Sequence, residues 1–187
     1  MANGKVHSRL GDGLLRKLAE ASAIVIALAS LGITLYEANA TRDHDRMSVW
    51  PRLAQEASDS AGRYERTITN VGLGPALVRS FEIRLDETVQ TSWTPVVTAL
   101  LRGRSPEGAF FSAVGPGTVL LPGRTIHVLT VIAGNLSATA MAQDHRVTSR
   151  LCYCSLYGEC WSTATHQAEP LQVPRCASND TASVVRY

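Results

Sequence analysis

The first forty residues contain one long apolar run. No charged residue occurs over 21–36. Sixteen residues are short for a membrane span, but a helix that begins near Leu14 is long enough, because Arg16 and Lys17 can extend toward the lipid headgroups. We therefore predict a transmembrane helix over 14–36.

The charges around this helix predict its orientation. Basic residues on its N-terminal side favour a cytoplasmic tail over 1–13 and export of everything that follows the helix. The competing interpretation is a cleaved signal peptide, because Ala38-Asn39-Ala40 has the small residues that signal peptidase prefers. We favour the uncleaved anchor, and both interpretations export the rest of the chain.

The two halves of the predicted span differ in side-chain size. On a helical wheel, small and hydroxyl-bearing residues gather on one half: Ser22, Ala23, Ala27, Ala29, Ser30 and Thr34. Large aliphatic residues such as Ile24 and Leu28 occupy the other half. Small residues let helices approach closely in lipid. We predict a helix-docking face here, against the alternative that Ala and Ser are simply common in membrane spans.

A polar juxtamembrane collar follows the span. Its characteristic residues are Arg42, His44, Arg46 and Trp50. No further ligands near His44 complete a metal site, so a solvated charged segment is the preferred interpretation. Trp50 either lies at the membrane interface or begins the folded domain. The segment 55–62 is rich in Ala, Ser, Asp and Gly and is interpreted as a loop, so the collar and linker are expected over 37–62.

From residue 63 onward, short alternating runs replace the helical pattern. "RYERTITN" and "SFEIRLD" alternate apolar and polar residues, which indicates half-buried strands. "GTVLLPGRTIHVLTVIAG" is expected to form a hairpin turning at Pro122-Gly123. Ile126, Val128 and Ile132 are expected to share one face of this hairpin. The spacing of these runs predicts an immunoglobulin-like antiparallel β-sandwich over 63–187.

One short helix interrupts the strands. In "TSWTPVVTALLRGR" the apolar residues recur at helical spacing from Trp93 to Leu101. Thr94 is the expected N-cap and Pro95 the first helical residue. We expect this helix to cover an edge or an end of the sheets. The predicted fold class is therefore mainly β, with one short helix, after an N-terminal transmembrane helix.

Four cysteines lie near the C-terminus, at Cys152, Cys154, Cys160 and Cys176. Alternation along a strand places Cys152 and Cys154 on one face, and the five-residue loop 155–159 would put Cys160 opposite Cys154. This geometry predicts a Cys154–Cys160 disulfide and leaves Cys152 to hold Cys176. Four cysteines allow three pairings, so the spacing alone does not prove this one.

Metal binding and redox chemistry are the alternatives for the same cysteines. Structural zinc sites use ligands two to four residues apart in two separate knuckles, and this spacing differs from that pattern. Redox catalysis would favour C-x-x-C. Because thiols pair with each other in an oxidising exported domain, we predict disulfides and expect no metal and no cofactor.

Other function classes find little support in the composition. The formal net charge is +2, and no block of like charges forms a nucleic-acid surface. The chain contains neither G-x-S-x-G nor H-E-x-x-H, and we assign no catalytic residue. We therefore expect no nucleic-acid partner. The predicted span and the exported domain make the lipid bilayer and other membrane-protein subunits the expected partners.

Four stretches carry a resemblance: "YEANATRDHDRMSVWPRL", "TNVGLGPALV", "LLPGRT" and "CYCSLYGECW". Together they resemble an uncharacterised bacterial family of single-span membrane proteins with a small exported β-sandwich domain. The collar of that family follows R-x-H-N-R-L-S-V-x-P, which is matched here at Arg42, His44, Arg46, Ser48, Val49 and Pro51. Asp45 and Met47 depart from it. The resemblance implies a bacterial inner-membrane location and a periplasmic domain, and carries no activity.

These observations predict a non-catalytic, membrane-anchored interaction protein. The leading hypothesis is an accessory subunit of a larger bacterial membrane complex, for instance a respiratory or photosynthetic one, whose periplasmic face it covers. The alternative is an exported metal-binding or thiol-redox protein that uses the cysteine cluster. A third class is an exported enzyme without a recognisable motif.

Overall fold

The computed structural model describes residues 4–176. Its first element is α1, Gly4–Ser48, an unbroken helix of 45 residues that is about 68 Å long at 1.5 Å per residue. The chain divides into two compact units, one up to Met47 and a second that begins at Ser48. The part of α1 over Arg16–Ser48 is long and apolar enough to cross a membrane, and its apolar window is not buried by the protein. The helix therefore continues through the predicted collar instead of ending at Tyr36.

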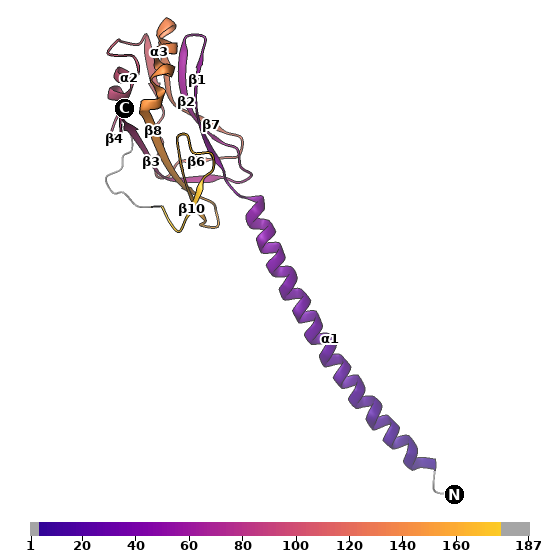
Figure 1. The fold of residues 1–187 in the computed structure, drawn as a ribbon. Coiled ribbons are helices and arrows are strands. Elements are labelled where there is room, and N and C mark those ends of the chain that lie inside the picture. Colours follow the sequence, from indigo (N-terminus) through magenta and orange to yellow (C-terminus); the bar gives the residue numbers. More distant parts are fainter. Residues whose placement is uncertain (1–3, 177–187) are drawn as a thin grey trace. The chain divides into compact units, whose positions relative to one another are not determined.

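The second unit contains two antiparallel sheets (Figure 1). The first sheet has the order β1 (Leu53–Ser60), β2 (Arg63–Asn70), β7 (Thr125–Ile132) and β5 (Gly108–Phe111). The second has the order β10 (Leu171–Val173), β9 (Cys160–Ala164), β8 (Val147–Cys154), β3 (Ala76–Leu85) and β4 (Thr88–Gln90), with β6 (Val119–Leu120) also paired to β3. This confirms the mainly β, sandwich-like class. The immunoglobulin-like connectivity stays a prediction.

The core lies between the inner faces of the two sheets. The largest fully buried side chains are Trp93, Tyr64, Tyr153, Phe81, Leu53, Ile68, Ile83, Leu100, Leu101, Leu129, Leu151 and Val78. On β3 a register shift between Val78 and Ser80 changes which residues face inward. Such a bulge lets Val78 and Phe81, three positions apart, both enter the core. The half-buried strand predicted from the alternation in "SFEIRLD" is confirmed, with Phe81 and Ile83 buried and Leu85 half-buried.

A second bulge corrects the predicted face of β7. The register between β2 and β7 shifts between Arg66 and Thr67, so Val128 is the extra residue on β7. Beyond it the buried residues are Leu129 and Val131, while Ile132 is only half-buried. The prediction that Ile132 shares one face with Ile126 and Val128 was wrong, because a bulge reverses the alternation that the sequence pattern assumes.

The predicted hairpin around Pro122-Gly123 is also corrected. The chain does turn there, and Gly123 adopts φ +71°. However, β6 pairs with β3 in the second sheet, whereas β7 pairs with β2 and β5 in the first. The turn therefore carries the chain from one sheet to the other.

The segment interpreted as a linker contains a strand. Residues of 55–62 belong largely to β1, which pairs with β2 from Leu53 opposite Asn70 to Ser60 opposite Arg63. Most of its side chains are exposed or half-buried. The sequence LAQEASDS has no alternation of apolar and polar residues, so it does not signal a strand. Pairing with β2 along the whole of β1 overrides the preference of its Ala, Ser and Asp residues for a loop. The folded domain thus begins well before residue 63.

Two short helices complete the second unit, α2 (Thr94–Leu100) and α3 (Ser137–Ala142), with single 3₁₀ turns at Gly134–Leu136 and Asp144–Arg146. The predicted helix α2 is confirmed, with Val96, Val97 and Leu100 buried. Its N-cap position is Trp93 instead of Thr94, and no side chain caps it. Pro95 is therefore the second helical residue instead of the first, and it still lies in the first turn, where its missing N–H costs no helical hydrogen bond.

Asn70 organises the turn between β2 and β3. Its amide nitrogen donates to the carbonyls of Gly74 and Leu120, each at 2.8 Å. Its amide oxygen accepts from the backbone N–H of Gly72 at 3.0 Å and of Arg52 at 3.3 Å. The side chain is fully buried and fully bonded, which is the condition for a polar group in a core. The "TNVGLGPA" motif is therefore a structural turn that closes one end of the sandwich.

Gly74 lies against the backbone that enters the domain. A Cβ atom built there would be 1.8 Å from the carbonyl oxygen of Val49. We expect Gly74→Ala to destabilise the domain by about 1–3 kcal/mol or more, because backbone atoms have to move to admit the methyl group. Denaturant titration followed by Trp fluorescence measures the change.

Gly115→Ala is the matched control for this substitution. A Cβ atom at Gly115 meets nothing within 4 Å. If Gly74→Ala unfolds at the same denaturant concentration as Gly115→Ala, the close approach to Val49 does not constrain the fold.

Candidate functional site

The predicted docking residues of α1 form an exposed stripe of small side chains. All six lie in the exposed part of the helix. The hydroxyls of Ser22, Ser30 and Thr34 donate to carbonyl oxygens one turn earlier, Ala19 at 2.9 Å, Ile26 at 2.8 Å and Ser30 at 2.9 Å. These polar groups are therefore satisfied inside the helix, and the stripe can face either lipid or another helix without an unpaired donor.

The collar residues divide between the two units. Arg42, His44 and Arg46 lie in the last turns of α1 and are exposed. Trp50 lies in the domain: its carbonyl oxygen accepts from Leu73 N–H at 2.8 Å, and its ring meets Trp161 edge-on with centroids 6.4 Å apart. These contacts favour the second interpretation of Trp50, that this residue belongs to the start of the folded domain.

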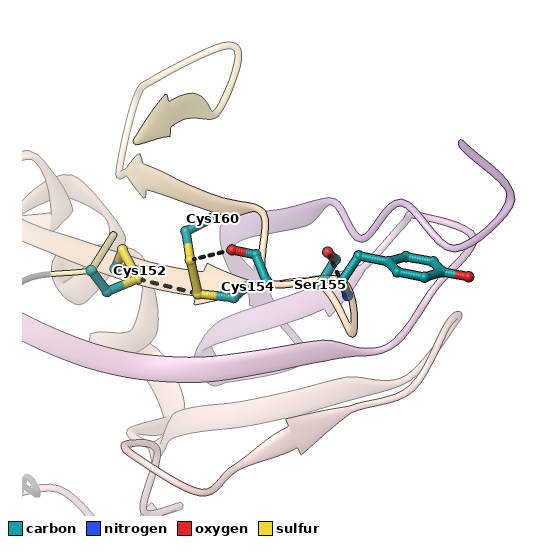
Figure 2. Close-up of a disulfide and its surroundings, with 7 residues drawn as sticks. Cys152, Cys154, Ser155 and Cys160 are labelled. Atoms are coloured by element: carbon teal, nitrogen blue, oxygen red, sulfur yellow. Dashed lines mark hydrogen bonds between the residues drawn. A yellow bond between two sulfur atoms is a disulfide. The ribbon is translucent and has the colours of Figure 1, made fainter. Parts of the chain in front are cut away.

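The cysteines lie on the β8–β9 hairpin and on the segment after β10 (Figure 2). Cys154 stands opposite Cys160 across the hairpin, and Tyr153 stands opposite Trp161. The two aromatic rings stack with centroids 6.0 Å apart on the core side. Side chains alternate along each strand, so the cysteines take the other face.

The structure has the two disulfides that strand alternation predicts. Cys154 is bonded to Cys160, and Cys152 is bonded to Cys176. The first bridge closes the hairpin, whose turn is held by the Ser155 N–H to Glu159 carbonyl bond of 2.8 Å. The second bridge ties the segment that follows β10 to β8. Both bridges thus fasten the C-terminal part of the second sheet.

The sulfur atoms of the two bridges lie side by side. The Sγ atoms of Cys154 and Cys176, which belong to different bridges, are 3.9 Å apart. Together with Cys160, they form a group of three sulfurs within 4.8 Å of one another. Thiolates in such a group would suit a soft metal ion. Here every one of these sulfurs is in a disulfide, so this oxidised form offers no thiolate ligand.

A buried ionic network lies between the sheets, and sequence reasoning did not predict it. A guanidinium nitrogen of Arg66 and the hydroxyl of Tyr64 both donate to the carboxylate of Asp144. Arg66 also donates to the Val147 carbonyl at 3.3 Å and to the Thr165 hydroxyl at 3.1 Å. Burial raises the pKa of Tyr64 above its ordinary value, so its hydroxyl stays protonated and acts as a donor.

The network continues through hydroxyls to an edge strand. The hydroxyls of Thr165 and Ser149 are 2.9 Å apart, and Ser149 donates to the side-chain oxygen of Gln55 at 2.6 Å. Among the described residues, the amide nitrogen of Gln55 is buried without a hydrogen-bond partner. A cavity of about 500 Å³ lies beside the network and is lined by residues that include Gln55, Arg66 and Asp144. The cavity is lined by both basic and acidic side chains, and two of them, Arg66 and Asp144, form an ion pair with each other.

These three groups of residues offer different chemistry. The stripe on α1 can contact lipid or a helix, the disulfides fasten the fold, and the ionic network orders the core. No protein-family model matches this chain, and no curated protein matches it.

Proposed function

We propose that this protein is a non-catalytic, membrane-anchored interaction protein of the bacterial inner membrane. In this proposal it is an accessory subunit of a larger membrane complex, for instance a respiratory or photosynthetic one. The helix α1 contacts other subunits within the bilayer, and the β-domain covers the periplasmic face of the complex.

The observation that carries this proposal is the combination of one apolar helix with a domain that holds two disulfides. Disulfides persist in oxidising compartments such as the periplasm and are rare in the cytosol. An apolar helix joined to such a domain fits an anchor whose domain is exported. The basic residues before the apolar run support a cytoplasmic N-terminus. The resemblance of the collar, turn and hairpin motifs supports a bacterial inner membrane.

The small-residue stripe supports a role inside the bilayer. A helix that serves only as an anchor needs no particular distribution of large and small side chains. In α1 the six predicted docking residues share one half with Ile26 and Ile33. Ile24, Leu28 and Leu31 on the other half are exposed by 62%, 63% and 56%. Close packing between helices in lipid uses small residues, because the hydrophobic effect supplies no attraction there.

The topology predicts the result of a reporter fusion. A reporter that is active only in the periplasm should be active when fused after Tyr187, and the mature protein should retain residues before Thr41. N-terminal sequencing of the purified protein checks the second point. An N-terminus at Thr41 would establish a signal peptide and remove the helix-docking part of the proposal.

The docking face is tested by filling it. The double substitution Ala27→Leu and Ser30→Leu keeps the span apolar, so membrane insertion should be unchanged. Association with the partner subunits should be lost, because the added side chains prevent close approach of the helices. Purification of the tagged chain in mild detergent, followed by identification of the co-purifying proteins, measures this association.

A matched control adds volume to the opposite half of the helix. Leu28→Phe with Leu31→Phe should leave the co-purifying proteins unchanged, because large residues already occupy that half. If the variant with Leu at positions 27 and 30 also retains its partners, α1 is only an anchor.

A further inference from the structure

The two disulfides place four sulfur atoms in sequence from the hairpin to the C-terminal segment. The order is Cys160, Cys154, Cys176 and Cys152, with bonds between the first two and the last two. The two middle sulfurs, of Cys154 and Cys176, are separated by 3.9 Å. This is close to contact between non-bonded heavy atoms. A thiolate at either middle position would therefore already lie against the neighbouring disulfide.

The four sulfurs differ in their access to solvent. Cys152, Cys154 and Cys160 are buried, with 7%, 5% and 6% of their surface exposed. Cys176 is only partly buried and follows the exposed Pro174 and Arg175. An external thiol thus reaches Cys176 more readily than the other three sulfurs.

We infer that the two bridges form one thiol–disulfide exchange site, at which an external dithiol reacts at Cys176 and the hairpin bridge Cys154–Cys160 is the bond that finally opens. This activity is independent of the interaction role proposed above. It requires only the contact between the sulfurs of Cys154 and Cys176 and an external dithiol as the reductant.

The exchange proceeds in three balanced steps, each an attack of a thiolate on a disulfide sulfur. A thiolate of the dithiol attacks Cys176, the Cys152–Cys176 bond breaks, and Cys152 leaves as a thiolate that takes up a proton. The second thiol of the reagent then releases Cys176 as a thiolate, and the reagent becomes a disulfide. Finally Cys176 attacks Cys154, a Cys154–Cys176 bond forms, and Cys160 leaves as a thiolate that takes up a proton.

The net reaction consumes one dithiol and yields its disulfide. Two electrons enter the protein, which then has one bridge, Cys154–Cys176, and two thiols, at Cys152 and Cys160. The C-terminal segment remains attached to β8, two residues further along the strand. The hairpin loses its covalent closure, next to a tip where Leu156 and Tyr157 are exposed by 61% and 55%.

Limited reduction of the full chain in detergent tests this inference. The protein is treated at pH 8 with less than one equivalent of dithiothreitol, quenched with acid, alkylated and mapped by mass spectrometry of unreduced peptides. We expect alkylated Cys152 and Cys160 together with a Cys154–Cys176 peptide pair. Two outcomes would overturn the inference. If only Cys152 and Cys176 are alkylated, or only Cys154 and Cys160, then one bridge has been reduced and no exchange between the bridges has followed.

A variant isolates the final step without any reductant. Cys152→Ser leaves Cys176 as a thiol beside the intact hairpin bridge, so the single alkylated residue should shift from Cys176 to Cys160 as the protein is incubated at pH 8. The shift should be much slower at pH 5, because the thiolate is the attacking species. Alkylation that stays at Cys176 at both pH values contradicts the proposed contact.

Paired variants provide the control. Cys152→Ser with Cys160→Ser retains only the two middle cysteines, and these should be joined in the folded chain with no titratable thiol. Cys154→Ser with Cys176→Ser retains the two outer cysteines, and these should both be alkylated after unfolding. If the two variants give the same thiol count, the sulfurs of Cys154 and Cys176 have no special proximity.

Discussion

Asp144→Asn should lower the free energy of unfolding of the β-domain by about 3–5 kcal/mol. Within residues 4–176, Asp144 supplies the only opposite charge bonded to the buried guanidinium of Arg66, whose side chain is 5% exposed, and the substitution removes it. Removing one partner of a buried ion pair leaves the other charge without solvent and without compensation. Denaturant titration in detergent, followed by the fluorescence of the buried residues Trp93 and Trp161, measures the change.

Two further variants separate the cost of the unpaired charge from the loss of the contact. Arg66→Met combined with Asp144→Leu removes both charges, and most of the stability lost in Asp144→Asn should return. Glu82→Gln breaks the ion pair with Arg84, which is partly exposed, and should change stability little. A small effect of Asp144→Asn, similar to that of Glu82→Gln, would show that water reaches Arg66.

Removal of the Cys152–Cys176 bridge by alanine at both positions should cost about 3 kcal/mol. The two cysteines are 24 residues apart, and a loop of this size restricts the unfolded chain strongly. Both cysteines are replaced so that no free thiol can pair wrongly. In the native state the bridge holds the segment after β10, a strand of three residues. Tryptic cleavage after Arg175 should therefore become faster while the Trp fluorescence stays native.

The hairpin bridge provides the comparison for this prediction. Cys154 and Cys160 are only six residues apart, so alanine at both positions should cost less, about 2 kcal/mol on the same loop-entropy estimate. Equal losses for the two bridges, or a larger loss for the hairpin bridge, would mean that native contacts outweigh the restriction of the unfolded chain.

The sequence pattern predicts elements whose buried and exposed residues alternate regularly. The strand at Phe81 and Ile83 and the helix after Pro95 are examples, since burial of an apolar face decides both. The disulfide pairing on β8 and β9 follows from the same alternation, with a loop length that fixes the register. Bulges are not predictable in this way. The extra residue Val128 in β7 depends on the pairing with β2, which lies far away along the chain.

The polar parts of the core illustrate the opposite case. Alternation in "RYERTITN" places Arg66 and Asn70 on the same face as Tyr64 and Ile68, so the pattern contained a sign that both are buried. Their partners do not follow from it. Asp144 lies in a 3₁₀ turn without periodicity, and only the tertiary fold brings it to Arg66. The ionic network could therefore not be identified from the sequence alone.

The edge strand β1 has a consequence for how the domain behaves when many copies share one membrane. In the proposed membrane-anchored form the copies are confined to a plane and their local concentration is raised, which favours pairing between the open edges of sheets in different molecules. Among the described strands β1 is the longest at an edge, and its sequence LAQEASDS places Glu56 and Asp59 where they are exposed. Like charges on approaching edges repel. The other described edge strands, β4, β5, β6 and β10, have only two to four residues. The polar and acidic side chains of β1 thus disfavour edge-to-edge pairing between the domains of neighbouring copies.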